Sequence, residues 1–320
     1  MTGSSSAPAG RVLVLAGGLS HERDVSMRSG RRITEALRHH GLEVDQRDVD
    51  AALLPTLQAD PPSCVVPVVH GESGEDGALR EVLELLQLPY VGATPQACRF
   101  AFDKPVASAL VAEAGLAVPA SVVLPAQTFR EVGAPAVMAA LLDRLGLPLV
   151  VKPTRGGSAL GCQVVRDAAD LPGAMVQCFS YGPVALVQRF ISGIEVAVAV
   201  VEDCDGASAL PAVAIRPDSG VYDFAARYTA GATEFEVPAP LSDTVAQACA
   251  DAAMTAHSVL GLRDLSRSDL IIDSDGVPWF LEVNVAPGMT ETSLVPLAIE
   301  QSGRKLGAVM AELVARAQAR

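Results

Sequence analysis

Two periodicities of apolar residues alternate along the first hundred residues of the chain. Short apolar runs at Arg11–Ala16 and Cys64–Val69 are typical of buried strands. Segments from about Ser26 to His40 and from Asp76 to Leu88 carry apolar residues at helical spacing, the first ending at Gly41 and the second with Asp76 as its expected N-cap. The order strand, helix, strand, helix predicts a small open α/β sheet.

The remainder of the chain reads as a mixture of helices and a second, more antiparallel set of strands. Ser219–Pro240 lacks apolar periodicity and is expected to form a long loop. The expected strands are Leu149–Lys152, Ala185–Phe190 and Glu195–Val201, and the expected helices are Asp103–Ala114, one within Pro119–Pro148, Asp243–Leu260, Ser293–Gln301 and Arg304–Gln318.

A hairpin near the C-terminus carries the clearest candidate chemistry. Leu270–Asp273 and Trp279–Val283 read as two strands joined by a turn at residues 274–276. Asp269 is expected at the head of the first strand, and Glu282 and Asn284, two residues apart, on one face at the end of the second. Three oxygen-bearing side chains without His or Cys suit Mg²⁺. The alternative is a polar strand end that faces solvent.

Two further segments could bind a nucleotide. Lys152 ends a strand and precedes the glycine-rich run PTRGGSALG, in which backbone N–H groups can approach an anion, although a plain glycine-rich turn gives the same pattern. Gln188 and Glu195 flank a turn after an apolar strand, where Glu195 could meet ribose hydroxyls; an ordinary strand–turn–strand is the alternative.

Two more candidates follow the first strands of the N-terminal sheet. Glu22 lies in GGLSHERDVS after the first strand, and His70 begins HGESGEDG after the next apolar strand. Open α/β sheets bind ligands at the carboxyl ends of their strands. Glu22 could bind a substrate ammonium group, whereas His70 could be either structural or functional.

Charge and composition exclude several classes of protein. The 320 residues carry a net charge of −13, which argues against a nucleic-acid binder, because phosphate contacts need clustered Lys and Arg. The six cysteines are scattered without a CxxC pair, and MTGSSSAPAG at the start reads as a disordered tail without an apolar secretory core. No stretch reaches the ~18 apolar residues of a membrane span. A cytoplasmic location with reduced thiols is expected.

Seven motifs together resemble one family over about residues 11–318. In order they are GGLSHERDVS, HGESGEDG, FDKPVAS, VVKPTRGGSALG, VYDFAARYTAGATEF, SRSDLIIDSDG and LEVNVAPGMTETSLVP. The chain is similar in these motifs to the D-alanine–D-alanine ligases of the ATP-grasp superfamily. The resemblance implies an α/β fold in which an N-terminal open α/β sheet domain (11–102, after a tail at 1–10) accompanies two α+β subdomains that clasp ATP (103–190 and 191–320), with a lid loop at 219–240.

The same resemblance implies an activity and its requirements. ATP and D-alanine would give a D-alanyl phosphate and then a dipeptide for peptidoglycan precursors. Two Mg²⁺ ions, for which Mn²⁺ can substitute, and a homodimer are implied as well, with neither a nucleic acid nor a membrane as partner.

Residue roles carry over from the family motif by motif. For ATP, the resemblance implies Lys104 and Lys152 on the phosphates, Gln188 at the adenine hinge, Glu195 on the ribose and Arg227 on the γ-phosphate. For the substrates, it implies Glu22, Ser158 and Tyr228 as a trio at the first D-alanine, His70 near that carboxylate and Ser293 on the second carboxylate. For the metal and the oxyanion, it implies Asp269, Glu282 and Asn284 as magnesium ligands, with Arg267 and the N–H of Gly288 as oxyanion donors.

Two residues depart from the family pattern, and the acceptor stays open because relatives with the same ATP chemistry use other acceptors. Gln188 stands where the family usually has Glu, and Arg227 where it usually has Lys, which keeps the charge but changes the geometry. The alternatives are a D-alanine–D-lactate or other carboxylate–amine ligase, a ligase of secondary metabolism, and a catalytically dead nucleotide-binding regulator. Tyr228 favours an amine acceptor over a hydroxy acid, and the complete set of expected metal ligands argues against the regulator.

Overall fold

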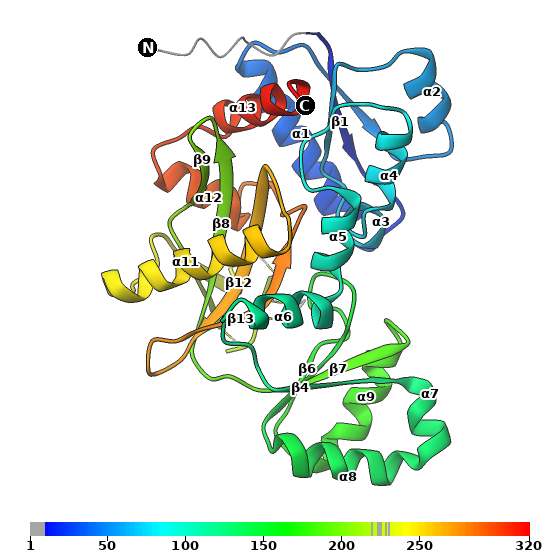
Figure 1. Ribbon diagram of the computed structural model, residues 1–320, viewed down its shortest axis with the longest axis vertical. Coiled ribbons are helices and arrows are strands. Elements are labelled where there is room, and N and C mark those ends of the chain that lie inside the picture. The colour runs from blue at the N-terminus through cyan, green and yellow to red at the C-terminus, as the bar shows by residue number, and fades with distance from the viewer. Residues whose placement is uncertain (1–9, 219, 223–225, 228, 230) are drawn as a thin grey trace.

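The computed structural model describes residues 10–218, 220–222, 226, 227, 229 and 231–320, arranged as three sheets with their covering helices (Figure 1). The tail expected at 1–10 therefore lies outside the described residues except for Gly10. All six cysteines are free. Among the described helices, none combines the length and the apolar character needed to cross a membrane.

The N-terminal sheet is parallel and contains both predicted strands together with a third strand that the sequence pattern did not predict. Strand β1 (Val12–Ala16) lies between β2 (Val44–Asp48) and β3 (Cys64–Pro67). The helices of this region are α1 (Arg23–His39), α2 (Leu53–Ala59), α3 (Glu72–Glu75), α4 (Ala78–Leu85) and α5 (Pro95–Phe102). Helix α4 begins two residues after the expected N-cap Asp76, because Gly77 is the N-cap and the Asp76 carboxylate accepts the N–H of Ala78 at 2.8 Å.

The middle sheet is antiparallel, in the order β4-β7-β5-β6, and carries the glycine-rich loop. Its helices bury an apolar core against one sheet face, to which Leu149, Val151 and Val187 contribute. The elements from α6 to β7 are α6 (Lys104–Glu113), β4 (Ser121–Pro125), α7 (Ala126–Thr128), a π-helical turn (Phe129–Gly133), α8 (Ala134–Leu145), β5 (Leu149–Pro153), β6 (Gln163–Val165), a 3-10 turn (Ala168–Asp170), α9 (Leu171–Phe179) and β7 (Val184–Arg189).

The third sheet is antiparallel and has β8 near its centre. Its order is β11-β10-β8-β12-β13, with β9 also paired to β8. The elements are β8 (Ile194–Asp203), β9 (Gly206–Ala209), β10 (Val213–Pro217), β11 (Thr233–Glu236), α11 (Asp243–Val259), β12 (Leu265–Ile272), β13 (Pro278–Asn284), α12 (Leu294–Gln301) and α13 (Leu306–Gln318). Strand β8 is buried on both faces: Val196, Val198 and Val200 enter the core under α11, and the intervening residues enter the core under α12 and α13.

The expected long loop at 219–240 is wrong in one respect, because it contains β11. Thr233–Glu236 alternates half-buried and exposed residues and pairs with β10. Phe235 packs edge to face on Tyr222 with ring centroids 6.3 Å apart. A four-residue strand with a single apolar side chain is too short to show periodicity, and the pairing with β10 supplies the order that the local pattern lacks.

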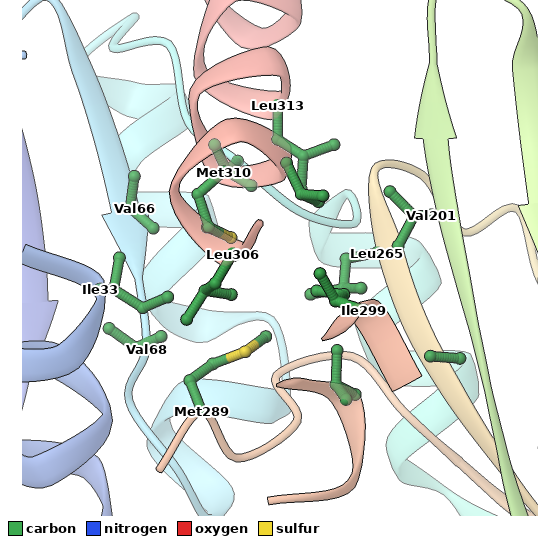
Figure 2. Close-up of a cluster of buried hydrophobic side chains, with 14 of the residues drawn as sticks. Ile33, Val66, Val68, Val201, Leu265, Met289, Ile299, Leu306, Met310 and Leu313 are labelled. Carbon is green, nitrogen blue, oxygen red and sulfur yellow. The ribbon is translucent and has the colours of Figure 1, made fainter. Parts of the chain in front are cut away.

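The C-terminal helices join the N-terminal sheet to the third sheet. Helix α13 packs along α1 and contacts both β3 and β8. Figure 2 shows Leu306 and Met310 between Val66 of the first sheet and Val201 of the third. One continuous apolar core therefore fixes the two sheets relative to each other, and with them the residues at their edges.

Candidate active site

The β12–β13 hairpin brings the three expected metal-binding side chains together. Asp269 pairs directly with Glu282, and Arg267 pairs with Asn284. Since side chains alternate along a strand, these four residues share one face of the hairpin. Asp269 lies in the middle of β12 and not at its head, because the strand begins four residues earlier, at Leu265.

Glu282 lies among several cations. Its carboxylate is 3.3 Å from Nζ of Lys104, which also donates to the carbonyl of Gly156 at 2.7 Å. Burial alone would raise the pKa of Glu282, but Lys104, Lys152 and Arg227 lower it to about 2. The pKa of Lys152 is lowered by burial, an effect that Glu282 opposes. Glu282 is therefore ionised throughout the physiological range.

Arg267 is held by Asp269. Nε and one Nη of the guanidinium donate to the two carboxylate oxygens at 2.7 and 2.8 Å, in a bidentate pair that is almost fully buried. Burial would lower the pKa of Arg267, yet the neighbouring carboxylate raises it above its ordinary value. The guanidinium thus keeps its charge and a fixed plane.

The glycine-rich loop reaches the N-terminal domain. Ser158 and the residue after it have φ of 52° and 55°, a left-handed conformation that is strained for residues other than glycine. In this conformation the Ser158 hydroxyl donates to Glu22, 136 residues away in the sequence. A Cβ at Gly157 would lie 3.1 Å from the Glu22 carboxylate, so a larger residue there would require a small shift of Glu22. Tyr228, the expected third member, lies outside the described residues.

His70 is buried and hydrogen-bonds to residues of both the N-terminal and the C-terminal parts of the chain. Its Nδ1 donates to the carbonyl of Ala286 at 2.9 Å, and Nε2 accepts from the hydroxyl of Ser29 at 3.0 Å. That hydroxyl in turn accepts the N–H of Met289 at 3.1 Å. Burial lowers the pKa of His70 to about 4, so the ring is neutral. Both ring nitrogens are used to position the segment around Gly288.

Ser293 stands at the start of α12. Its hydroxyl accepts the N–H of Thr290 at 2.9 Å and lies 2.9 Å from the Thr290 hydroxyl. Arg32 of α1 donates to the carbonyl of the same threonine. The segment between Asn284 and α12 is therefore tied to the N-terminal domain.

The candidate residues line two adjoining cavities of about 460 and 510 Å³. Lys104, Arg227 and Glu282 line both and mark their junction. The first cavity is also lined by Glu22, His70, Ser158, Arg267, Asn284, Gly288 and Ser293, and the second by Lys152, Gln188, Glu195 and Asp269. Every described site residue expected from the sequence thus borders one or both cavities.

The second cavity is lined by one carboxylate with an unusual pKa, that of Glu195. Burial raises the pKa of Glu195 to about 7, although Arg227 opposes this shift. The guanidinium of Arg227 stacks 4.1 Å from the centroid of the Tyr222 ring and donates to the carbonyl of the same residue at 3.3 Å.

The sequence analysis missed Glu75, which lines the first cavity. It is buried, and its carboxylate accepts the N–H of Gly71 at 2.8 Å. Burial, and then the nearby charge of Glu22, raise its pKa to about 8. The available signal was its place within HGESGEDG, where His70 alone was selected.

Comparisons with known proteins agree with this arrangement. Residues 110–315 match the family model described as the C-terminus of D-ala D-ala ligase. The D-alanine–D-alanine ligase of Anaeromyxobacter dehalogenans strain 2CP-1 is 40% identical over 89% of this chain and 90% of its own length. The crystal structure of Bacillus anthracis D-alanine–D-alanine ligase complexed with ATP superimposes with a TM-score of 0.80 at 25% identity, covering 98% of both chains. The VanG D-Ala:D-Ser ligase of Enterococcus faecalis gives 0.80 at 26% identity, covering 95% of this chain and 98% of its own.

A parallel α/β sheet domain, two antiparallel sheet subdomains and a polar double cavity between them define an ATP-dependent ligase of the ATP-grasp class. Within that class, the chain belongs to the D-alanine–D-alanine ligase family.

Proposed function

We propose that the chain joins two D-alanine molecules at the expense of ATP, in the cavities that meet at Glu282. The carboxylate of the first D-alanine attacks the γ-phosphorus, ADP leaves with the bonding electrons, and a D-alanyl phosphate forms. The amine of the second D-alanine then attacks the acyl carbon and phosphate leaves. The junction of the two cavities at Lys104, Arg227 and Glu282 carries the proposal, because phosphoryl transfer requires the two substrates to meet at cations.

The first cavity suits two amino-acid substrates. Glu22, oriented by Ser158, offers a carboxylate to an ammonium group, and Ser293 with its neighbouring backbone offers donors to a carboxylate. Arg267, fixed by Asp269, and the N–H of Gly288 are proposed as donors to the tetrahedral oxyanion. Acyl phosphates hydrolyse, so closure of the 219–240 lid, with Tyr228 in it, is proposed to exclude water.

The second cavity suits ATP, and the junction suits Mg²⁺. Lys152 is proposed for the phosphates, Glu195 for the ribose and Gln188 for the base. Asp269, Glu282 and Asn284 are proposed to hold two Mg²⁺ ions, with Mn²⁺ as a substitute, because they present hard oxygen atoms on one hairpin face and Glu282 stays ionised. Bound there, the metal would neutralise charge on the transferring phosphoryl group.

The test is product analysis. The purified chain with ATP, Mg²⁺ and D-alanine should release ADP and phosphate in equal amounts and yield D-alanyl-D-alanine by mass spectrometry. Absence of ADP release with D-alanine present would reject the function.

A different acceptor is the main alternative, since one structural relative is a D-Ala:D-Ser ligase. D-Serine, D-lactate and a panel of other amino acids, each supplied together with D-alanine, separate the possibilities. Chiefly ester with D-lactate would indicate the depsipeptide branch, and preferred incorporation of an amino acid other than D-alanine or D-serine would favour secondary metabolism. For the assembly we propose a cytoplasmic homodimer with the domain division 11–102, 103–190 and 191–320, which light scattering and limited proteolysis test.

A further inference from the structure

Gln188 lines the second cavity. It lies on β7, where its partner on β5 is Val150, and its side chain is on the sheet face opposite the core that buries Val187. Ile271 and Leu281 approach the same cavity from the third sheet. Gln188 is only 2% exposed. Apolar walls with a few placed polar groups are the usual form of a site for a small organic ligand.

Among the residues that the structure describes, none fixes the Gln188 carboxamide through its nitrogen. Its Nε2 is buried and has no acceptor among the described residues. A buried donor without a partner is costly, which points to an acceptor supplied by a ligand. Because no protein group holds Nε2, the carboxamide can rotate by half a turn and present either its nitrogen or its oxygen to the cavity.

A carboxylate at this position would behave differently. Glu is the residue usual here in the family. An ionised Glu side chain only accepts hydrogen bonds, so it favours the 6-amino group of adenine and repels a 6-oxo group. Gln can accept from the amino group through Oε1 or donate to the oxo group through Nε2. We propose that Gln188 allows this site to use 6-oxopurine nucleoside triphosphates as well as ATP. The inference rests on the proposed function, because it concerns the nucleotide of the same reaction.

The experiment compares ATP with ITP, which carries a 6-oxo group and no 2-amino group. Values of kcat/KM are measured by D-alanine-dependent release of the nucleoside diphosphate. The wild type should prefer ATP by less than about tenfold. Gln188→Glu should raise the ATP preference by about 5- to 150-fold, the cost of leaving two buried acceptors face to face. Gln96→Glu adds the same charge at an exposed position of α5 outside both cavities, and should keep the wild-type ratio.

The outcomes separate the inference from the proposed function. A wild-type preference for ATP above about 100-fold, or equal ATP-to-ITP ratios in the wild type and Gln188→Glu, would overturn the inference while ATP turnover upholds the ligase. If D-alanine elicits no release of ADP, the proposed function fails. Thermal-shift titrations of the wild type with ATP and with ITP then still test the inference. Similar affinities for the two nucleotides support it, and a strong preference for ATP overturns it. Should Gln188→Glu fail to fold, the wild-type ratio alone decides.

Discussion

Glu282 carries a negative charge that offsets the surrounding cations of the site. Lys104 contacts it directly, and the two cavities meet beside it. Glu282→Gln keeps the shape but removes the negative charge that offsets the surrounding cations and would bind metal. We expect kcat to fall by about two to three orders of magnitude, with more Mg²⁺ needed for the remaining activity.

Steady-state kinetics over a Mg²⁺ titration, with circular dichroism to check the fold, measure this effect. Glu291→Gln makes the same change at an exposed residue nearby and should leave kcat unaltered. Near-normal turnover in Glu282→Gln would remove it from the proposed metal site.

His70 makes stability depend on pH. Its pKa falls from the usual 6.5 to about 4 in the folded chain through burial, so below pH 6.5 the unfolded state binds a proton that the native state does not. The stability associated with the neutral ring is complete above pH 6.5 and is lost as the pH falls towards 4. Its full size is roughly 3 kcal/mol, at about 1.4 kcal/mol per pKa unit.

His70→Asn keeps a donor towards Ala286 without a titrating ring. The wild type should exceed this variant in free energy of unfolding at pH 7.5, and the difference should narrow by about 2 kcal/mol at pH 5. Urea denaturation at both pH values measures the change. His40→Asn, at an exposed position, should show no such narrowing; a constant difference for His70→Asn would mean that the ring titrates normally.

At the scale of elements, the start of β8 beside the second cavity lies very close to the end of β12. A Cβ at Gly193 would lie 2.0 Å from the carbonyl oxygen of Ile272, which is backbone and cannot rotate away. Gly193→Ala should therefore displace the start of β8, and Glu195 with it. We expect a loss of about 1–3 kcal/mol in stability and an increase of about tenfold or more in KM for ATP, with a smaller effect on KM for D-alanine.

Thermal unfolding and the two KM values test this expectation. Gly182→Ala places a methyl group in ordinary contact, 3.5 Å from Pro153, and is the matched control. Equal increases in both KM values would show a general loss of the fold and not a local shift at the ATP end.

The elements that could be predicted are those whose order is local. Helix α11 and strands β8 and β13 have long periodic patterns, and their predicted positions agree with the structure within a few residues. The strands that were not predicted, β2, β4, β6, β9, β10 and β11, have three to five residues each, and pairing with neighbouring strands supplies much of their order. A ladder between segments separated in sequence leaves no periodic trace in either one.

The site residues show the same difference between contacts that are local in sequence and contacts that join distant segments. The convergence of Asp269 and Glu282 follows from a hairpin and could be derived from the residues alone. The pairs Glu22–Ser158 and Lys104–Glu282 join distant segments. The family resemblance indicated the first pair in advance, and nothing in the sequence indicated the second. Glu75 shows the limit of both approaches, because its raised pKa depends on burial beside Glu22, which no local pattern reveals.

At the scale of the whole molecule, the packing of α13 on α1 joins the last helix to the first domain and thereby fixes both walls of the first cavity. A Cβ at Gly307 would lie 2.5 Å from the carbonyl oxygen of Ala36, so the two helices touch at backbone distance. Gly307→Ala must push them apart and loosen the core drawn in Figure 2. We expect a loss of about 1–3 kcal/mol in the free energy of unfolding.

Gly173→Ala, in α9 with open space around it, should instead stabilise the fold by about 0.5–1 kcal/mol, because alanine is the better helix former. Denaturant unfolding of both variants measures the contrast, and a Gly307→Ala protein as stable as Gly173→Ala would show that this contact does not hold the sheets together.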